Sequence, residues 1–389
     1  MRDAVIVEAL RTPVGKRNGS LSGVHPVDLS AHVLRSLVER TGLDPALVDD
    51  VIWGCVAQVG EQTFDLARTA VLAAGWPESV PGVTIDRQCG ASQQAVHFAA
   101  AGLIAGQYDV VVAGGVESMS RIPMGASLQV GGNPFTAEGW TRRYGPVVPH
   151  QGLGAEMVAQ QWHLPRRRLD EFSLASHEKA AAAADTGLFE AEIAPVPGQL
   201  TGGAALAADE GIRRGGTLEA LAALRPAFAE GGVVTAGNAS QISDGSAAVL
   251  MMTSERAAAL GLRPLARIHT AVLAAADPVV MLTAPLQATR KALTRSGLRL
   301  DDIGAFEVGE AFASVPLAWL ADIAGNDAGI EKAINPNGGA IALGHPLGAS
   351  GARVMTTLVH HLLAAGIRYG LQTMCEGGGQ ANATIVERV

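Results

Sequence analysis

The chain has 389 residues, of which 48% are hydrophobic, 17% charged and 4% aromatic, and its formal net charge is −8. This length suits a large core with more than one lobe. The negative charge and the lack of a long basic block give nucleic-acid binding no electrostatic support, and charged or polar residues interrupt every apolar run, so we expect no membrane-spanning helix.

The three cysteines, Cys55, Cys89 and Cys375, lie far apart and form no CxxC motif. This spacing predicts neither a disulfide framework nor a zinc site, so no bound metal is expected. The N-terminal stretch MRDAVIVEALRTPVGK lacks the uninterrupted apolar region of a signal peptide and predicts a strand followed by a turn. We therefore expect a cytoplasmic protein with reduced thiols.

Residues 83–115 predict a strand, a helix and a second strand. VTI (83–85) is typical of a buried strand, and CGASQQAVHFAAAGLIAGQYDVVVAGG (89–115) of a helix, a turn and a strand that ends in paired glycines. Cys89 lies where the first strand gives way to the helix, a position that favours an anion and lowers the pKa of a thiol. Cys89 is therefore a candidate nucleophile, although free cysteine is also common as a small buried hydrophobic residue.

The next 113 residues, 119–231, carry glycine, proline and arginine clusters with few strand signals, which predicts an inserted loop domain. Within it, LDEFSLASHEKAAAAADTGLF predicts a helix because alanine has high helix propensity. Beyond it we expect a helix in SDGSAAVLMMTSERAAAL, capped by Ser243 or Asp244, and a strand in PLARIHTAVLAA. The predicted parts are an N-terminal half (1–118 and 232–270), the loop domain and a C-terminal half (271–389).

The chain repeats itself once. LGASGARVMTTLVHHLLAAGIRYGLQTMCEGGG (347–379) has the same order as 89–115: Gly-Ala-Ser, an apolar helix, a glycine turn and a strand ending in paired glycines. Upstream, 291–311 parallels 36–56, each with a helix, a Gly-Leu stop, an Asp-Asp pair and a strand. Repeated strand-helix-strand order predicts parallel sheets with helices on their faces, in a pseudo-twofold α/β protein.

The second repeat contributes two further candidates. His345 precedes the equivalent helix in a tight Gly-His-Pro turn, where it can donate to an oxyanion or carry a proton. Cys375 ends the strand ahead of three glycines, which let backbone N–H groups approach a ligand. Either residue alone is also compatible with a purely structural role. The twofold relation, however, would bring both helix starts to one cleft, giving a nucleophile, an acid/base thiol and a histidine.

These motifs resemble those of the thiolases, the acetyl-CoA acyltransferases, along essentially the whole chain. The resemblance covers AVIVEALRTPVGK, CGAS, VVAGGVESMS, LRPAF, TAGNAS, EAFA, NPNGGAIALGHPLGASGAR and CEGGG. DRQCG and the ending RYGLQTMCEGGGQANATIVERV are similar to degradative 3-ketoacyl-CoA thiolases of actinobacteria, some of which act on steroids. The resemblance implies two pseudo-equivalent halves in a layered α/β/α/β/α core, and a homodimer or homotetramer.

The resemblance also implies a mechanism. Cys89 would attack a thioester or 3-ketoacyl carbonyl and become acylated. Cys375 would deprotonate CoA, or take a proton from acetyl-CoA in condensation, with a pKa tuned towards neutrality. One oxyanion hole would use the backbone N–H groups of Cys89 and Gly377, and the other would use His345 with a water for the enolate oxygen. CoA and acyl-CoA would be substrates, with no tightly bound cofactor.

One position departs from the family pattern. In most thiolases an asparagine of an NEAFA motif holds that water, whereas this chain reads VGEAFA with Gly309 in the asparagine's place. Loss of one oxyanion donor costs about 10²–10³ in rate. Either an extra water or a neighbouring side chain replaces the amide, or the enolate step is impaired. We favour replacement because Cys89, His345 and Cys375 are all present.

The resemblance places the CoA contacts on four residues. Arg213 in GIRRGGT would face the nucleotide end, where a guanidinium suits phosphate. Ser240 in GNAS would contact the pantetheine arm, and His150 and Phe312 would line the same tunnel. Arg213 is equally compatible with a solvated surface charge, and Ser240 with a helix cap.

Two alternatives remain open at this point. A ketosynthase-like or hydroxymethylglutaryl-CoA-synthase-like condensing enzyme would share the fold, but Cys375 in CEGGG argues against it. A CoA- or lipid-binding homologue that has lost catalysis is supported only by Gly309. The residues do not define the acyl group, its length or the physiological direction.

Overall fold

The structure is a computed structural model that describes residues 2–129 and 131–389. The strands are β1 (Val5–Arg11), β2 (Gly15–Lys16), β3 (Asp50–Gly54), β4 (Val83–Ile85), β5 (Val110–Ser118), β6 (Ser243–Met252), β7 (Ala266–Ala275), β8 (Ala305–Val308), β9 (Tyr369–Glu376) and β10 (Gln380–Arg388). The helices are α1 (Pro26–Thr41), α2 (Leu66–Ala73), α3 (Ala91–Ala105), α4 (Glu138–Tyr144), α5 (Gln151–Gln161), α6 (Arg166–Asp185), α7 (Gly198–Thr201), α8 (Leu218–Ala222), α9 (Ser254–Ala259), α10 (Ala284–Ser296), α11 (Ser314–Ala324), α12 (Ala328–Ala333), α13 (Ala340–Leu343) and α14 (Leu347–Ala365).

The strands of the described residues form one mixed sheet in the order β4-β3-β5-β6-β1-β7-β10-β9-β8, with β2 on β6. Among the strands of residues 2–129 and 131–389, parallel pairs occur only where the repeated units lie, between β3 and β4, β3 and β5, and β8 and β9. Strands β6, β1, β7 and β10 pair antiparallel. The prediction of parallel sheets is therefore wrong for the centre, because those strands lie outside the two strand-helix-strand units.

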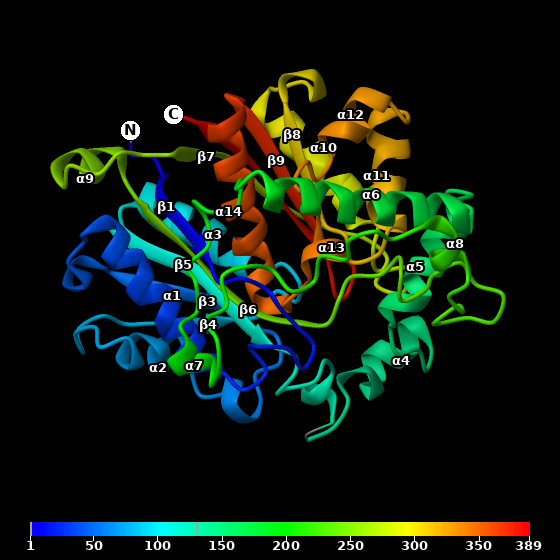
Figure 1. Ribbon diagram of the computed structural model, residues 1–389, viewed down its shortest axis with the longest axis horizontal. Helices are drawn as coiled ribbons and strands as arrows, with labels where there is room; N and C mark the ends of the chain where they lie inside the picture. The colour runs from blue at the N-terminus through cyan, green and yellow to red at the C-terminus, as the bar shows by residue number, and fades with distance from the viewer. Residues whose placement is uncertain (1, 130) are drawn as a thin grey trace.

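The helices and the sheet form alternating layers (Figure 1). Along β5, Val110 and Val112 pack against α1 and α2, whereas Val111 and Ala113 pack against α3 and α14. This alternation follows from the two-residue period of a strand. Helices α10 and α11 cover the outer face of the second half. The layered α/β fold expected from the sequence is confirmed, with α3 and α14 as the inner layer.

The two inner helices touch at their repeated Gly-Ala-Ser starts. A Cβ built on Gly351 would lie 2.2 Å from the backbone nitrogen of Gln93, so only glycine allows this approach. The N–H of Ala352 donates to Ser92 Oγ at 2.9 Å. The start of α14 is thereby fixed against the start of α3, which brings the two helix ends into one region as the repeat predicts.

The segment after the insertion folds differently from its prediction. Residues expected to form one helix capped by Ser243 or Asp244 form β6, and α9 follows with Thr253 as its cap. Every residue of β6 is buried. A strand covered on both faces reads as a continuous apolar run, and its alanines favoured the helical interpretation.

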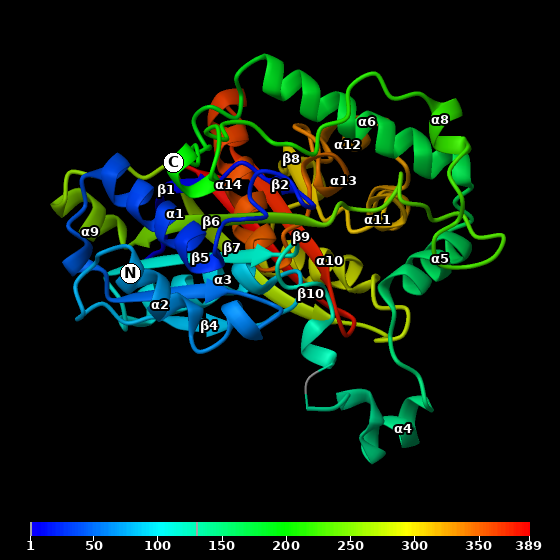
Figure 2. The ribbon, with the colours of Figure 1, turned by 60° about the horizontal axis from the view of Figure 1, so that its bottom comes forward.

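The chain leaves the sheet after β5 and returns with β6, and α4 to α8 lie between. Figure 2 shows α4 standing away from the layers. The predicted division into halves and a loop domain stays a prediction. None of the helices in residues 2–129 and 131–389 combines the length and the apolar composition that crossing a bilayer requires.

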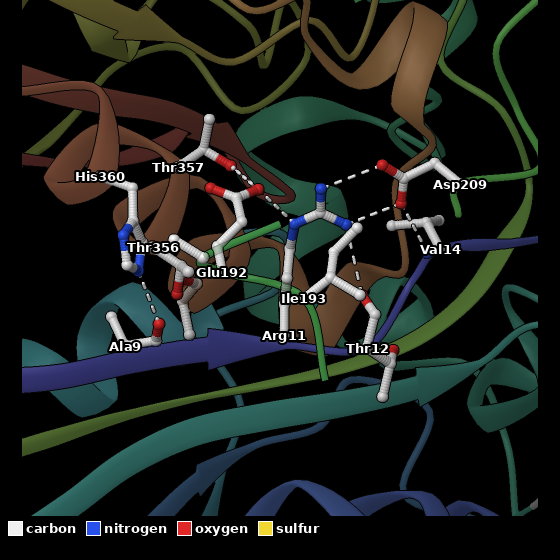
Figure 3. A network of polar contacts seen from close by, with 12 residues as sticks. Ala9, Arg11, Thr12, Val14, Glu192, Ile193, Asp209, Thr356, Thr357 and His360 are labelled. Atoms are coloured by element: carbon white, nitrogen blue, oxygen red, sulfur yellow. Dashed lines mark hydrogen bonds and ion pairs between the residues drawn. The ribbon is translucent and has the colours of Figure 1, made fainter. Parts of the chain in front are cut away.

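A buried ion-pair network joins the segment between β5 and β6, the β5–β6 connection, to the sheet (Figure 3). Arg11 of β1 is 0% exposed. Its Nε donates to Glu192 at 2.6 Å, and Nη1 and Nη2 donate to Asp209 at 2.6 and 2.9 Å. Glu192 also accepts from the hydroxyl of Thr357 in α14. One guanidinium thus ties β1, the connection and the inner helix layer together.

Candidate active site

Cys89 lies in the turn between β4 and α3. Gln88 has a φ of +50°, and its N–H donates to Asp86 Oδ1 at 2.6 Å, which fixes the turn just before the thiol. A Cβ on Gly90 would lie 2.0 Å from Glu376 Oε1. Glycine at position 90 therefore lets the end of β9 approach the start of α3.

The Cys89 thiol is surrounded by groups from both halves. The backbone N–H groups of Cys89 and Gly377 hydrogen-bond to it and lower its pKa, but burial, followed by the Glu376 carboxylate, raises the pKa to about 12. The expectation that the helix start lowers this pKa is wrong, because desolvation outweighs the helix end. Cys89 is a neutral thiol at pH 7 in this environment.

Cys375 lies near the end of β9 and is 2% exposed. Burial raises the pKa of its thiol, and a negative charge on Cys89 would raise it further, because the two cysteines are close enough to interact electrostatically. The expected tuning towards neutrality is therefore not found. Apolar side chains from α5, α11 and the β7–α10 connection pack around this thiol, together with Phe312 from the segment between β8 and α11.

His345 is fixed in the turn before α14. Its backbone N–H donates to Gln241 O and to Ser243 Oγ, both at 3.2 Å, and Nδ1 lies 2.6 Å from Ser350 Oγ. Burial, and then the charge of Arg353, lowers the pKa of the imidazole to about 4. His345 is therefore neutral at pH 7 and offers a ring that can hydrogen-bond without a positive charge.

A small cavity connects the predicted residues of the second half. Gly309, His345 and Cys375 all line it, and its volume is about 10 Å³ for the centre of a water molecule. Cys89 lies outside this lining, but the N–H of Gly377 hydrogen-bonds to its sulfur and its charge would act on Cys375. The structure thus places Gly309, His345 and Cys375 around one cavity, with Cys89 and Gly377 next to Cys375.

Glu310, the residue after Gly309, fixes the position of the cavity wall that Gly309 forms. Glu310 is buried and accepts hydrogen bonds from Ser176 of α6, from Asn335 and from the N–H of Ile341 at the start of α13. These bonds hold three segments together behind the cavity. The glutamate of the EAFA motif therefore positions the wall that Gly309 forms.

An aromatic row leads from the insertion to Cys375. The ring of His150, at the start of α5, lies 5.5 Å from the ring of Phe228, which lies 5.8 Å from Phe312. Phe228 and Phe312 belong to the apolar cluster that includes Cys375. Phe228 was not predicted from the sequence, although it is the last residue of the LRPAF motif. The motif does not indicate that its ring points toward Phe312.

The other two predicted CoA contacts differ in position. The N–H of Ser240 donates to Ala311 O at 3.0 Å, and the adjacent Ala239 pairs with Phe312, so Ser240 adjoins the aromatic row. Arg213 is exposed, and its backbone N–H donates to His177 Nδ1. The role of Arg213 at the nucleotide end stays a prediction.

Replacing Glu376 by glutamine is expected to let Cys89 react at lower pH. Burial raises the pKa of Glu376 to about 8, so its carboxylate becomes charged mainly above that pH and then raises the pKa of Cys89. Wild type and E376Q should react with iodoacetamide at similar rates near pH 6.5, and E376Q should react faster above pH 8. The rate is measured by mass spectrometry of the Cys89 peptide. The exposed Glu255→Gln variant is the control, and coincident profiles for all three proteins contradict the prediction.

Comparison with known proteins gives a consistent result. The family descriptions "Thiolase, N-terminal domain" and "Thiolase, C-terminal domain" match residues 4–255 and 262–388. Steroid 3-ketoacyl-CoA thiolase FadA6 of Mycobacterium tuberculosis is 51% identical over 100% of this chain and 95% of its own length. The 3-ketoacyl-CoA thiolase of Aliivibrio fischeri is 42% identical over 100% of both chains. The crystal structure of the Bacillus anthracis acetyl-CoA acetyltransferase has a TM-score of 0.90 and 37% identity, covering 100% of this chain and 99% of that one.

Proposed function

Because this chain belongs to the thiolase family, we propose that it transfers acyl groups between 3-ketoacyl-CoA and CoA through an acyl intermediate on Cys89. Thiolysis gives acetyl-CoA and a shortened acyl-CoA, and the reverse reaction is a Claisen condensation. The observation that carries the proposal is the meeting of two thiols and one neutral imidazole around a single buried site. Splitting the transfer at a covalent intermediate lowers the barrier of each step.

In the first half-reaction, the sulfur of Cys89 attacks the 3-keto carbon as its proton passes to His345. The bond between C2 and C3 of the substrate breaks, and acetyl-CoA leaves as an enolate that takes a proton at carbon from Cys375. In the second half-reaction, Cys375 removes the proton of the CoA thiol, whose sulfur attacks the acyl carbon. Cys89 leaves the acyl carbon and takes its proton back from His345. Both thiols are neutral before they act, so each proton moves together with bond formation in a site shielded from water.

Two sets of donors would stabilise the negative oxygens. The backbone N–H groups of Cys89 and Gly377 already point to the Cys89 sulfur, so they are placed for the oxygen of an acyl group attached there. His345, with a water, would serve the enolate oxygen. Donors fixed in advance in a dry site contribute most to this kind of catalysis.

The relatives differ in the acyl group that their names give for the substrate. The Mycobacterium tuberculosis relative is named for steroid substrates and the Aliivibrio fischeri relative for 3-ketoacyl-CoA without that restriction. We propose a bulky, steroid-derived 3-ketoacyl-CoA as the preferred substrate. The four CoA contacts proposed from the sequence, on Arg213, Ser240, His150 and Phe312, would hold the shared CoA part of every substrate.

The test is a thiolysis panel that runs from acetoacetyl-CoA to long and bulky 3-ketoacyl-CoAs. The expected result is release of acetyl-CoA, with a higher kcat/KM for the bulky substrates, and an acetyl adduct on Cys89 after incubation with acetyl-CoA, seen by mass spectrometry. A ketosynthase-like enzyme would fail the thiolysis assay, and a binding protein would form no adduct. If no member of the panel is cleaved and no adduct forms, the proposed function is wrong.

Two further properties belong to this proposal. The described cysteines Cys55, Cys89 and Cys375 are free thiols, and since the chemistry needs two of them reduced, we place the enzyme in the cytoplasm. We also propose a homodimer or homotetramer, because most oligomers of soluble enzymes are closed and symmetric. Light scattering after size-exclusion chromatography determines the assembly.

A further inference from the structure

The cavity beside Gly309 is lined by two buried charged side chains that the mechanism above does not use. Glu307 and Arg353 line it, and each is 2% exposed. Glu307 Oε1 and Arg353 Nε and Nη1 have no hydrogen-bond partner within residues 2–129 and 131–389. An unpaired buried polar atom costs about 1–3 kcal/mol, so three of them on two side chains that line one cavity point to a bound group.

The cavity exists because Gly309 has no side chain. The N–H of Gly309 donates to Thr373 O at 2.9 Å, which holds its backbone on β9. A Cβ built on Gly309 would lie 3.4 Å from Met374 Cα and 3.7 Å from Cys375 N, both ordinary contact distances. A side chain therefore fits here, and its lack leaves space between Gly309 and the acid/base thiol.

The size and polarity of this space suit one water molecule. Its volume of about 10 Å³ is close to the smallest space that holds a single ordered water, which needs two to four polar partners. Arg353 supplies N–H donors, Glu307 supplies a carboxyl oxygen, and His345 lines the same space. An apolar ligand would leave all three unpaired atoms without partners.

We propose that this cavity binds one ordered water, held by Arg353 and Glu307, and that this water donates a hydrogen bond to the enolate oxygen beside His345. The water accepts from the guanidinium of Arg353 and donates one hydrogen to Glu307 and the other to the enolate. Arg353 and Glu307 are then positioning residues, and they take over from the asparagine of the family pattern. This inference rests on the proposed function, because an enolate forms only if a carbon–carbon bond is cleaved or made here.

The electrostatics of the pair fit this arrangement. Burial raises the pKa of Glu307 to about 8, although the charge of Arg353 lowers it. At neutral pH the carboxyl group is therefore largely protonated, and Arg353 keeps a net positive charge beside the cavity. A positive charge behind the water makes the hydrogen that points to the enolate a stronger donor.

The first test compares two substitutions at one position. Gly309→Ala places a methyl group in the water site, and Gly309→Asn supplies an amide from the same backbone position. Each is assayed for cleavage of a 3-ketoacyl-CoA and for exchange of acetyl groups between acetyl-CoA and labelled CoA, which needs no enolate. We expect G309A to lower the ratio of cleavage to exchange by about 10²-fold, and the ratio for G309N to exceed that for G309A by at least about tenfold. Equal ratios in wild type and G309A overturn the proposal.

The second test addresses Glu307 by a double-mutant cycle. Glu307→Met keeps the chain length but removes the acceptor, and Glu307→Gln keeps an acceptor. In the wild-type background, E307Q should exceed E307M in the cleavage-to-exchange ratio by about tenfold. In the G309N background, the loss caused by E307M should largely disappear, since the two substitutions act on the same hydrogen bond. An equal loss in both backgrounds means that Glu307 is purely structural and overturns the proposal.

The fraction of Cys89 acetylated by acetyl-CoA measures the fraction of folded active sites in every variant. If E307M does not fold, G309A and G309N test the proposal without it. A crystal structure of the wild-type enzyme provides a readout besides activity. It should contain a water within hydrogen-bond distance of Arg353 and Glu307, and that water should be missing in G309A. A cavity without density at that place overturns the proposal. Lack of Cys89 acetylation refutes the proposed function instead, so the two failures are distinguishable.

Discussion

Replacing Cys89 by alanine is expected to lower kcat for thiolysis by about 10⁴- to 10⁶-fold, the range seen when a nucleophile or its partner is removed from a covalent mechanism. In the proposed mechanism the sulfur of Cys89 carries the acyl group in both half-reactions, so cleavage and acetyl exchange should fall together. This distinguishes C89A from the substitutions at Gly309, which separate the two activities. Rates are measured by release of acetyl-CoA and by label transfer between acetyl-CoA and CoA.

Cys55→Ala is the matched control for C89A. Cys55 is also a buried free thiol, but it lies in the core with α1 and α2, and burial raises the pKa of its thiol well above the usual value. We expect C55A to form the acetyl adduct and to turn over. If C89A keeps more than about one-hundredth of the wild-type rate, or carries an acetyl group on another residue, Cys89 is not the nucleophile.

Replacing Arg11 by methionine is expected to lower the free energy of unfolding by about 3–5 kcal/mol. Methionine fills much of the same volume but leaves Glu192 and Asp209, each 1% exposed, without the cation that pairs with both. A buried carboxylate without a partner is strongly unfavourable. Urea unfolding followed by circular dichroism measures the change.

Two variants control this experiment. Arg299→Met removes an ion pair whose side chains are 78% and 72% exposed, and we expect it to cost less than about 1 kcal/mol. Adding Glu192→Gln and Asp209→Asn to R11M should restore part of the loss, since neutral amides tolerate burial better than charges. If R11M costs no more than the Arg299 control, water reaches the two carboxylates and the network contributes little to stability.

The parts of the fold that repeat were predictable from the sequence. Helix α3 with β5, and α14 with β9, were expected from the two Gly-Ala-Ser stretches and their paired glycines, and the structure has both. Strand β6 was not predictable in this way, because a strand buried on both faces has no alternation to distinguish it from a helix. The antiparallel centre of the sheet depends on contacts between distant segments, which no local pattern records.

The site was predictable in position and not in electrostatics. Cys89 and His345 lie at junctions between elements, where the repeat predicts convergence, and the structure brings them together with Cys375. The raised pKa of each thiol comes from burial by segments far away in sequence and from the charge of Glu376. No sequence motif shows that the Glu376 side chain points toward the thiols. The catalytic roles of these residues stay predictions that the experiments above test.

The glycine contact between α3 and α14 has a consequence for how substrate specificity can change in proteins with this fold. Gly351 touches the backbone at Gln93 directly, so the two lobes cannot rotate apart without breaking the interior of the molecule. We therefore expect the spacing between Cys89 and Cys375 to change little during turnover. Adaptation to a new acyl chain must therefore act on the long excursion between β5 and β6, where insertions and deletions leave that spacing undisturbed.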